Sequence, residues 1–265
     1  MKPVTLATLK SMKQAGEKIA VLTAYDYSFA TVLERVGMDI ILVGDSLGMV
    51  IQGHDSTLPV QMQDMIYHSS CVARACHRSL LMVDMPFMSY HLNPQQAMGN
   101  AGRLMQEGGA HMVKLEGGAH MAETIHFLVE RGVPVCAHLG LMPQSVHQLG
   151  GFRVQGKQQD SAARLRADAV LLQQAGAAAV LLEAVPATLA KAITADLDIP
   201  TIGIGAGPDC DGQVLVLQDV LGVYGAVSPK FAKNFLHGQE NVEAAVRAYA
   251  EAVRTGNFPG PEHGY

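Results

Sequence analysis

Four carboxylic acid side chains in this chain each stand at the end of a short apolar run. The runs end at Asp45, Asp84, Glu116 and Glu183. A short apolar run bounded by turn residues is typical of a buried strand, and parallel α/β folds place their active sites at the carboxyl ends of such strands. Because buried carboxylates require a cation or shared protons, we expect these acids to form one cluster that binds a cation or exchanges protons.

Three of the acids have the chemistry of a metal site. Asp45, Asp84 and Glu116 offer only oxygen donors, with no cysteine or paired histidine nearby, and this favours Mg²⁺ over Zn²⁺. Mg²⁺ usually keeps bound waters and shares its coordination with substrate. The alternative is that each acid caps the helix or turn that follows it.

Glu183 belongs to the same set but lies two predicted strands further along than Glu116. A carboxylate held apart from a metal can act as a base that removes a proton beside a carbonyl polarised by that metal. Partial desolvation would raise its pKa and suit it to this task. A fourth metal ligand or an ion-pair partner are the alternatives for Glu183.

Two nitrogen-bearing side chains belong to the same predicted strand ends. Lys114 precedes Glu116 by two residues, so both side chains point to the same side of their strand. Lys114 could balance the acids, bind a substrate carboxylate or form a Schiff base, the last being disfavoured by the metal-like cluster. His138 ends another apolar run and either lines the site or is a hydrogen-bonded structural group.

Two further segments could contribute to function. The segment 203–207 (Gly-Ile-Gly-Ala-Gly) follows a predicted strand at a position where barrels often bind phosphate, although it lacks the rest of a dinucleotide motif. Tight backbone turning is the other explanation. His54 and Asp55 lie in a long loop that could be a functional lid or a plain surface loop.

The acids require a scaffold of strands that all point the same way. Apolar runs predict strands near residues 19–23, 40–44, 80–84, 111–115, 133–137, 178–182, 200–204 and 222–227. Apolar spacing and cap residues predict helices over 28–37, 93–108, 160–176, 186–193 and 241–254. Each of three units repeats a helix end, a turn, a strand and an acid. We therefore predict a closed (β/α)₈ barrel rather than an open sheet, as a single domain over 1–265 with an N-terminal extension and a C-terminal helix.

Composition narrows the class of protein. The 265 residues are 49% apolar and 16% charged, with a net charge of −5. No basic stripe is present, so nucleic acid and anionic membranes are poor partners. No apolar run approaches the roughly 18 residues of a membrane-spanning helix, and no secretion signal is evident. We expect a cytoplasmic protein with small-molecule substrates whose cysteines stay reduced: Cys71, Cys76, Cys136 and Cys210.

At these residues the chain resembles the 3-methyl-2-oxobutanoate hydroxymethyltransferase (ketopantoate hydroxymethyltransferase) family. The resemblance covers nearly the whole chain in order and rests on the segments 23–26, 43–48, 53–60, 84–87, 113–118, 137–141, 143–145, 154–156, 182–183, 203–207 and 211–213. The chain departs from the family pattern at residues 226–228, before Pro229. No candidate catalytic residue lies there.

The resemblance implies a (β/α)₈ barrel of the phosphoenolpyruvate/pyruvate-like type that binds Mg²⁺ and assembles as a homodecamer. It implies transfer of a one-carbon unit from 5,10-methylenetetrahydrofolate to 3-methyl-2-oxobutanoate, which gives 2-dehydropantoate in pantothenate biosynthesis. Position by position, it places Asp45, Asp84 and Glu116 around the metal. It assigns Glu183 as the proton acceptor, and it assigns to the 2-oxo acid the residues Asp45, Ser46, Asp84, Lys114 and His138.

Two other functions compete with this one. A Mg²⁺-dependent lyase or mutase acting on phosphoenolpyruvate or oxaloacetate-like acids would share the barrel, but the loop 85–90 after Asp84 holds no cysteine or lysine for such chemistry. A catalytically silent barrel that serves as a binding subunit would be expected to lack some of the strand-end acids, and all four are present.

Overall fold

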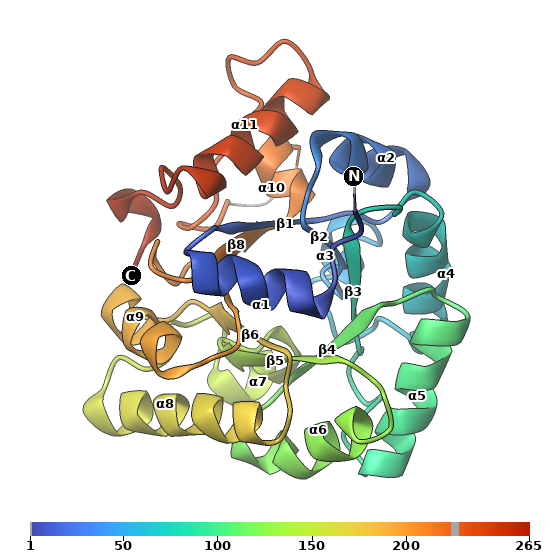
Figure 1. The fold of residues 1–265 in the computed structure, drawn as a ribbon, viewed down its shortest axis with the longest axis vertical. Helices are drawn as coiled ribbons and strands as arrows, with labels where there is room; N and C mark the ends of the chain where they lie inside the picture. The colour runs from blue at the N-terminus through green and yellow to red at the C-terminus, as the bar shows by residue number, and fades with distance from the viewer. Residues whose placement is uncertain (1, 224–227) are drawn as a thin grey trace.

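The computed structural model describes residues 2–223 and 228–265, which form a closed barrel of parallel strands in sequence order with helices around it (Figure 1). Its strands are β1 (Ile19–Thr23), β2 (Ile40–Val43), β3 (Leu80–Asp84), β4 (Met112–Glu116), β5 (Val135–Gly140), β6 (Ala179–Glu183), β7 (Thr201–Ile204) and β8 (Gly212–Leu215). The predicted (β/α)₈ barrel is confirmed. Its division into a single domain over 1–265 stays a prediction.

Most of the helices pack against the outside of the strands, whose side chains are almost all buried on both faces. They are α1 (Leu6–Ala15), α2 (Tyr27–Val36), α3 (Leu47–Val50), α4 (Met62–Ala73), α5 (Pro94–Gln106), α6 (Ala122–Val129), α7 (Val146–Leu149), α8 (Gln159–Gln174), α9 (Ala187–Asp196), α10 (Leu217–Leu221) and α11 (Val242–Arg254), with short 3₁₀ turns at Ala119–Met121, Pro143–Ser145 and Pro261–His263. The five predicted helices correspond to α2, α5, α8, α9 and α11.

Local sequence explains where these helices begin and end. Asp26 accepts a hydrogen bond from the backbone N–H of Phe29 at 2.9 Å and so caps α2, and Asn241 caps α11 in the same way. Gly37 ends α2 in the left-handed conformation, as the sequence predicts. Pro186 stands just before the first residue of α9 rather than inside its first turn.

The predicted eighth strand is wrong. Within the predicted range 222–227, Gly222 caps α10 and residues 224–227 lie outside the described residues. The strand that closes the barrel is β8, which pairs with both β7 and β1. It follows β7 without an intervening helix and starts at Gly212, where a Cβ would lie 2.5 Å from the carbonyl oxygen of Ile19. This close approach requires glycine at the start of the strand. A search for apolar runs therefore does not detect β8.

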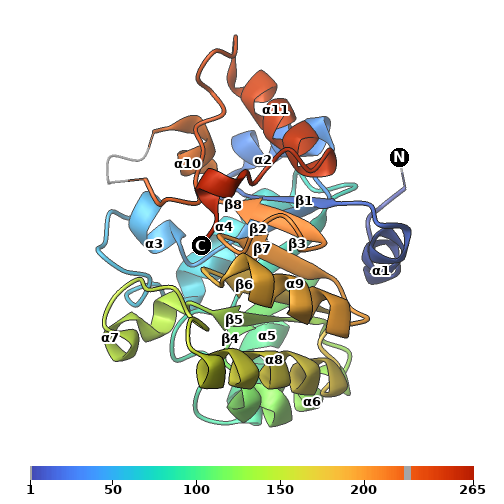
Figure 2. The same cartoon turned by 90° about the vertical axis from the view of Figure 1, so that its left-hand side faces the viewer.

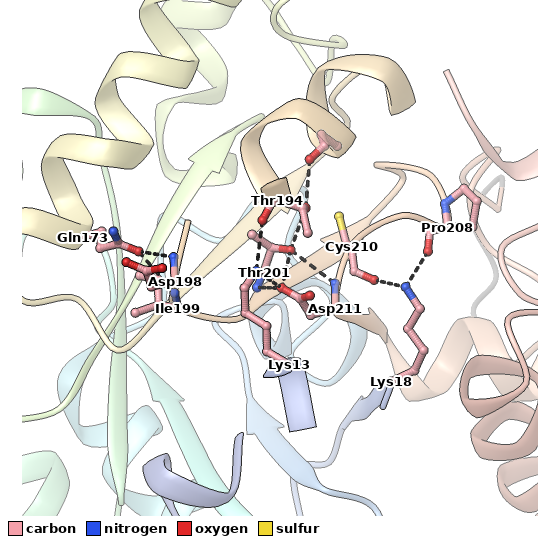
Figure 3. A network of polar contacts seen from close by, with 11 residues as sticks. Lys13, Lys18, Gln173, Thr194, Asp198, Ile199, Thr201, Pro208, Cys210 and Asp211 are labelled. Carbon is pink, nitrogen blue, oxygen red and sulfur yellow. Dashed lines mark hydrogen bonds and ion pairs between the residues drawn. The ribbon is translucent and has the colours of Figure 1, made fainter. Parts of the chain in front are cut away.

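The two ends of the barrel differ in structure. Helix α1 covers the end where the strands begin, whereas α3 and α7 lie at the opposite end, where the strands finish (Figure 2). At the α1 end, Lys13 pairs with Asp211 at 2.7 Å, and Asp211 also accepts hydrogen bonds from Thr201 (Figure 3). Lys18 donates to the carbonyl oxygens of Pro208 and Cys210 nearby. We call this end the base and the other end the mouth.

None of the described helices combines the length and apolarity needed to cross a lipid bilayer. All four cysteines are free thiols, with Cys136 and Cys210 buried in the core and Cys71 and Cys76 partly exposed.

Candidate active site

A cavity of about 500 Å³ opens at the mouth of the barrel and brings the predicted site residues together. Its lining includes every one of them: Asp45, Ser46, Asp84, Lys114, Glu116, His138 and Glu183. The prediction that the strand-end acids meet at one mouth is thereby confirmed for all four acids.

Parallel pairing in register explains this convergence. Asp84 on β3 lies opposite Lys114 on β4, and Glu116 lies opposite His138 on β5. Side chains alternate along each strand, so Lys114 and Glu116 both point into the cavity while Leu115 between them packs against the outer helices. The local spacing seen in the sequence thus produces one cluster from different strands.

Lys114 is the centre of the cluster. Its Nζ atom lies 3.1 Å from Asp84 Oδ1 and 3.2 Å from His138 Nδ1. Burial alone would lower the pKa of this amine, but the surrounding carboxylates of Asp84, Glu116 and Asp45 outweigh it and raise the pKa above its ordinary value. Lys114 therefore stays protonated, which suits it to bind an anion and not to form a Schiff base.

His138 is neutral and its tautomer follows from its neighbours. Burial, and after it the charge of Lys114, lowers the pKa of His138 well below its ordinary value. Because an ammonium group can only donate, His138 Nδ1 accepts from Lys114 and the ring proton is on Nε2. This N–H faces Glu183 Oε2 at 3.3 Å, although no well-aligned hydrogen bond forms.

Glu183 is the acid best suited to take a proton. Burial raises its pKa to about 7, with the charge of Lys114 acting in the opposite direction. A carboxylate with this pKa is ionised in part near neutral pH and is a stronger base than an exposed glutamate. Its side chain is 14% exposed, so it can still meet a ligand in the cavity.

Two acids are linked by a residue that sequence reasoning left unassigned. The side-chain amide of Gln144 donates to Asp45 Oδ2 at 2.8 Å, and the backbone N–H of Gln144 donates to Glu116 Oε2 at 3.1 Å. Tyr90 holds Gln144 in place by donating to its side-chain oxygen at 2.7 Å. Tyr25 lies within hydrogen-bond distance of Ser46, 2.8 Å between the two oxygens. These contacts fix the orientation of the cluster.

The described residues contain no group of three His, Cys, Asp or Glu side chains that already forms a set of metal ligands. The carboxylate of Asp84 is nevertheless close to Asp45, because it accepts from the backbone N–H of Asp45 at 3.0 Å and its charge adds to the effect of burial in raising the pKa of the Asp45 carboxyl. The other oxygen of Asp84, Oδ1, is buried and lies 3.1 Å from Lys114 Nζ, without a well-aligned hydrogen bond. Any cation placed here would therefore need further oxygen ligands from water and substrate.

The charge balance of the cavity fits such a cation. Four acids line it, while Lys114 is the one lysine or arginine among the described lining residues. Burial, and next the charge of Asp84, raises the pKa of Asp45 to about 7, and burial and Asp45 raise that of Glu116 well above its ordinary value. An excess of buried carboxylate oxygen is the donor set that a hard divalent cation takes.

The glycine segment at 203–207 is filled by protein side chains. A Cβ on Gly205 would lie 2.8 Å from the ring of Phe231 and 3.1 Å from the ring of Tyr265. The segment thus allows close packing at the mouth, which favours the backbone explanation over a phosphate site. His54 and Asp55 are exposed and are not among the lining residues, so the lid stays a prediction.

Barrel and site together define an enzyme of the (β/α)₈ class. Solved structures of the same fold include a phosphonomutase-like protein from Burkholderia cenocepacia J2315, with 16% identity, a TM-score of 0.66, and coverage of 82% of this chain and 94% of that chain. Phosphonopyruvate hydrolase in complex with oxalate and Mg²⁺ has 15% identity and a TM-score of 0.62 over 94% of this chain and 96% of that one. At these identities the likeness shows the fold alone.

Sequence comparison defines the family. The profile of the ketopantoate hydroxymethyltransferase family matches residues 3–261. Proteins called 3-methyl-2-oxobutanoate hydroxymethyltransferase are 61% identical in Azoarcus sp. strain BH72 and 58% identical in Aromatoleum aromaticum, each over 100% of this chain and 97% of the relative. The relative from Thiobacillus denitrificans is 60% identical over 99% of this chain and all of its own length. The chain belongs to the ketopantoate hydroxymethyltransferase family.

Proposed function

We propose that this protein transfers a hydroxymethyl group from 5,10-methylenetetrahydrofolate to 3-methyl-2-oxobutanoate in pantothenate biosynthesis. A carbon–hydrogen bond of the keto acid is broken and a carbon–carbon bond to the folate-borne carbon forms. Water supplies the hydroxyl oxygen, and tetrahydrofolate leaves with 2-dehydropantoate as the product. The observation that carries the proposal is Glu183, a buried carboxylate with its pKa raised to about 7 in the same cavity as the Lys114–Asp84 pair.

The keto acid would be held by the charged and hydroxyl groups of the cavity. Lys114 stays protonated and would bind the substrate carboxylate, with Ser46 as a hydrogen-bond donor to the same end of the molecule. His138 has its N–H directed towards Glu183 and would orient that carboxylate. Each role uses a group that already faces the cavity.

Asp45, Asp84 and Glu116 would surround a Mg²⁺ ion, with Asp45 and Asp84 as the adjacent pair. When bound, Mg²⁺ supplies Lewis-acid polarisation of the keto group and neutralises charge that develops on its oxygen. The fit rests on the excess of buried carboxylate oxygen over the single Lys114 ammonium among the described lining residues.

Glu183 would remove the proton from the branched carbon next to the keto group. Because burial raises its pKa to about 7, the driving force for this proton transfer exceeds that of an exposed glutamate. Lys114 would offset the negative charge of the substrate while the enolate exists. The enolate carbon then attacks the folate-borne carbon.

Exchange of the substrate proton with solvent tests this function without folate. 3-Methyl-2-oxobutanoate is incubated with the protein in D₂O, with Mg²⁺ or with a chelator, and the signal of the proton on the branched carbon is followed by NMR. We expect fast loss of the signal with Mg²⁺ and slow loss with the chelator. Exchange no faster than in protein-free solution under both conditions would exclude the proposal.

The same experiment separates the competing functions. A silent barrel would give no exchange. A lyase or mutase would instead consume phosphoenolpyruvate or oxaloacetate, which we expect this protein to leave unchanged because the loop after Asp84 offers no cysteine or lysine.

We also propose a cytoplasmic homodecamer. Exposed apolar side chains such as Tyr27, Tyr67 and Leu92 support burial against other copies, and sedimentation equilibrium would measure the assembly.

A further inference from the structure

The cavity at the mouth extends beyond the cluster that would hold the keto acid. At about 500 Å³ it has the size of sites that bind drug-sized molecules, of which a five-carbon acid fills only a part. The acids and Lys114 come from β3 to β6 and from the end of β2. The other side of the lining comes from β7, β8 and the segments after them, and includes Val216, Asp219, Phe231 and Tyr265.

Two aromatic side chains, Phe231 and Tyr265, line this second part of the cavity. Phe231 and Tyr265 both pack within about a van der Waals distance of the position that a Cβ on Gly205 would take. The charge of Glu183 also affects Tyr265: burial raises the pKa of the Tyr265 hydroxyl, and the charge of Glu183 raises it further. Glu183, Phe231 and Tyr265 line the same cavity, in which two substrates would meet.

Asp219 is a buried carboxylate that the chemistry on the keto acid does not use. Its side chain lines the cavity, the residue is only 9% exposed, and its carboxylate forms no hydrogen bond or ion pair with the described residues. Burial raises its pKa to about 6, and no neighbouring charge opposes this. The Asp219 oxygens are not among the fully buried, unpartnered atoms of the described residues, so they remain accessible from the cavity, and a ligand that supplies N–H groups could bind them there.

A reduced pterin has the matching chemistry. The edge of its 2-amino-4-oxopyrimidine ring carries an amino N–H and a ring N–H that point in the same direction. A carboxylate accepts two such parallel donors with its two oxygens. The flat heterocycle would also find aromatic faces in Phe231 and Tyr265, since stacked and edge-to-face contacts stabilise such rings.

We propose that Asp219 binds the amino-pyrimidine edge of the folate co-substrate, with Phe231 and Tyr265 beside the ring system. This inference rests on the proposed function, because it assigns the position of the second substrate in the same cavity. It places the folate-borne carbon on the Glu183 side, opposite the Asp219 contact.

The test replaces the carboxylate with an amide of the same shape. In Asp219→Asn we expect KM for 5,10-methylenetetrahydrofolate to rise by about 10–100-fold, the effect of losing charge-assisted hydrogen bonds in a buried site. KM for 3-methyl-2-oxobutanoate and the folate-free proton exchange should stay within about twofold of wild type. Asp209→Asn is the matched control: it removes an exposed carboxylate paired with Lys191, outside the cavity lining, and should leave both KM values unaltered.

An analogue of the co-substrate that carries hydrogen in place of the 2-amino group distinguishes contact from indirect effects. Wild type should bind this analogue about 10-fold or more weakly than the natural folate, whereas Asp219→Asn should bind the two alike. If Asp219 has only a structural role, the variant would lower the thermal midpoint, raise both KM values and keep the full preference for the amino group. That outcome would overturn the proposal.

The two proposals fail in different ways. Absence of proton exchange in wild type would remove the proposed function and with it the identity of the second substrate. Normal exchange together with an unaltered folate KM in Asp219→Asn would leave the function in place and remove only the role of Asp219.

Discussion

The base and the mouth of this barrel use charged residues in opposite ways. At the base, Asp39 is buried and pairs with both Arg78 and Arg254, at 2.9 and 3.3 Å, and it also accepts from the backbone N–H of Ala20. Lys13 and Asp211 are likewise paired with each other and with backbone groups. Each of these charges has its partners within the chain.

At the mouth, four carboxylates share one lysine, and burial raises the pKa of Asp45 and of Glu183 to about 7. Lys114 pairs with Asp84, but it is the one lysine or arginine among the described lining residues, so the excess of negative charge is suited to a cation and to substrates. The comparison suggests a division of roles, in which paired charges stabilise the fold at one end, while the excess charge at the other end would provide the proposed binding and catalysis.

The largest expected effect is at the mouth. Glu183→Gln removes the base and retains the shape of the side chain. We expect proton exchange to fall by about 10³-fold, within the range of general-base catalysis. NMR in D₂O measures the rate, and calorimetry should show that Mg²⁺ and the keto acid still bind. Exchange at the wild-type rate would remove Glu183 as the base.

The next effect concerns the cation. Asp84→Ala should weaken Mg²⁺ affinity by about 100-fold. Removing a group that only hydrogen-bonds to a metal ligand already weakens affinity by about 10–100-fold, and we expect the loss of a direct ligand to reach the upper end of that range. Calorimetric titration measures the affinity, and Glu183→Gln is the control that keeps the adjacent Asp45–Asp84 pair. Unaltered Mg²⁺ affinity in Asp84→Ala would show that the ligand assignment is wrong.

At the base we expect loss of stability without loss of catalysis. Asp39→Asn leaves Arg78 and Arg254 facing each other without the anion between them. The free energy of unfolding should fall by about 2 kcal/mol, less than the roughly 3–5 kcal/mol of a fully buried pair, because both arginines are partly exposed. Urea denaturation measures this change. The exchange rate per folded molecule should equal that of wild type, and a large fall in that rate would contradict the division between the two ends.

Local patterns explain which parts of this division could be predicted from sequence. Each strand-end acid follows directly on an apolar run, so its identity as Asp45, Asp84, Glu116 or Glu183 and its position at the mouth follow from a few adjacent residues. The alternation of strands and helices predicts seven of the strands in the same way. The eighth strand breaks that alternation.

Contacts between distant segments could not be predicted from these patterns. Gln144 orients Asp45 across 99 residues of chain, and Tyr90 reaches Gln144 across 54. Asp219 lines the cavity from α10, which directly follows β8, the strand that the sequence pattern did not predict. Nothing in the local sequence around these residues distinguishes them from ordinary polar residues, although Tyr90 lies in the loop directly after Asp84.

The pH dependence of exchange sharpens the assignment of the base. With its pKa at about 7, Glu183 is mostly protonated at pH 6 and mostly ionised at pH 8. Because the base must be ionised, we expect the exchange rate to rise by roughly tenfold between these two values and then to level off. Initial rates in buffers of constant ionic strength measure this profile. A rate that is flat or falls with pH would contradict a carboxylate base.

The smallest expected effect tests whether the unsatisfied charge of the mouth destabilises the fold. Burial raises the folded-state pKa of Glu116 above its unfolded value, so the folded protein holds the proton more tightly and loses stability as pH rises between the two values. In metal-free protein, Glu116→Gln should therefore match wild type at pH 4 and exceed its free energy of unfolding by about 1 kcal/mol at pH 8.

Denaturation in the presence of a chelator measures this difference, and Mg²⁺ provides the control. The ion should stabilise wild type at pH 8 more than it stabilises Glu116→Gln, because it balances the charge that the variant has removed. If Glu116→Gln were less stable than metal-free wild type at both pH values, the carboxylate would be a stabilising group like those at the base, and the contrast between the two ends would not extend to Glu116.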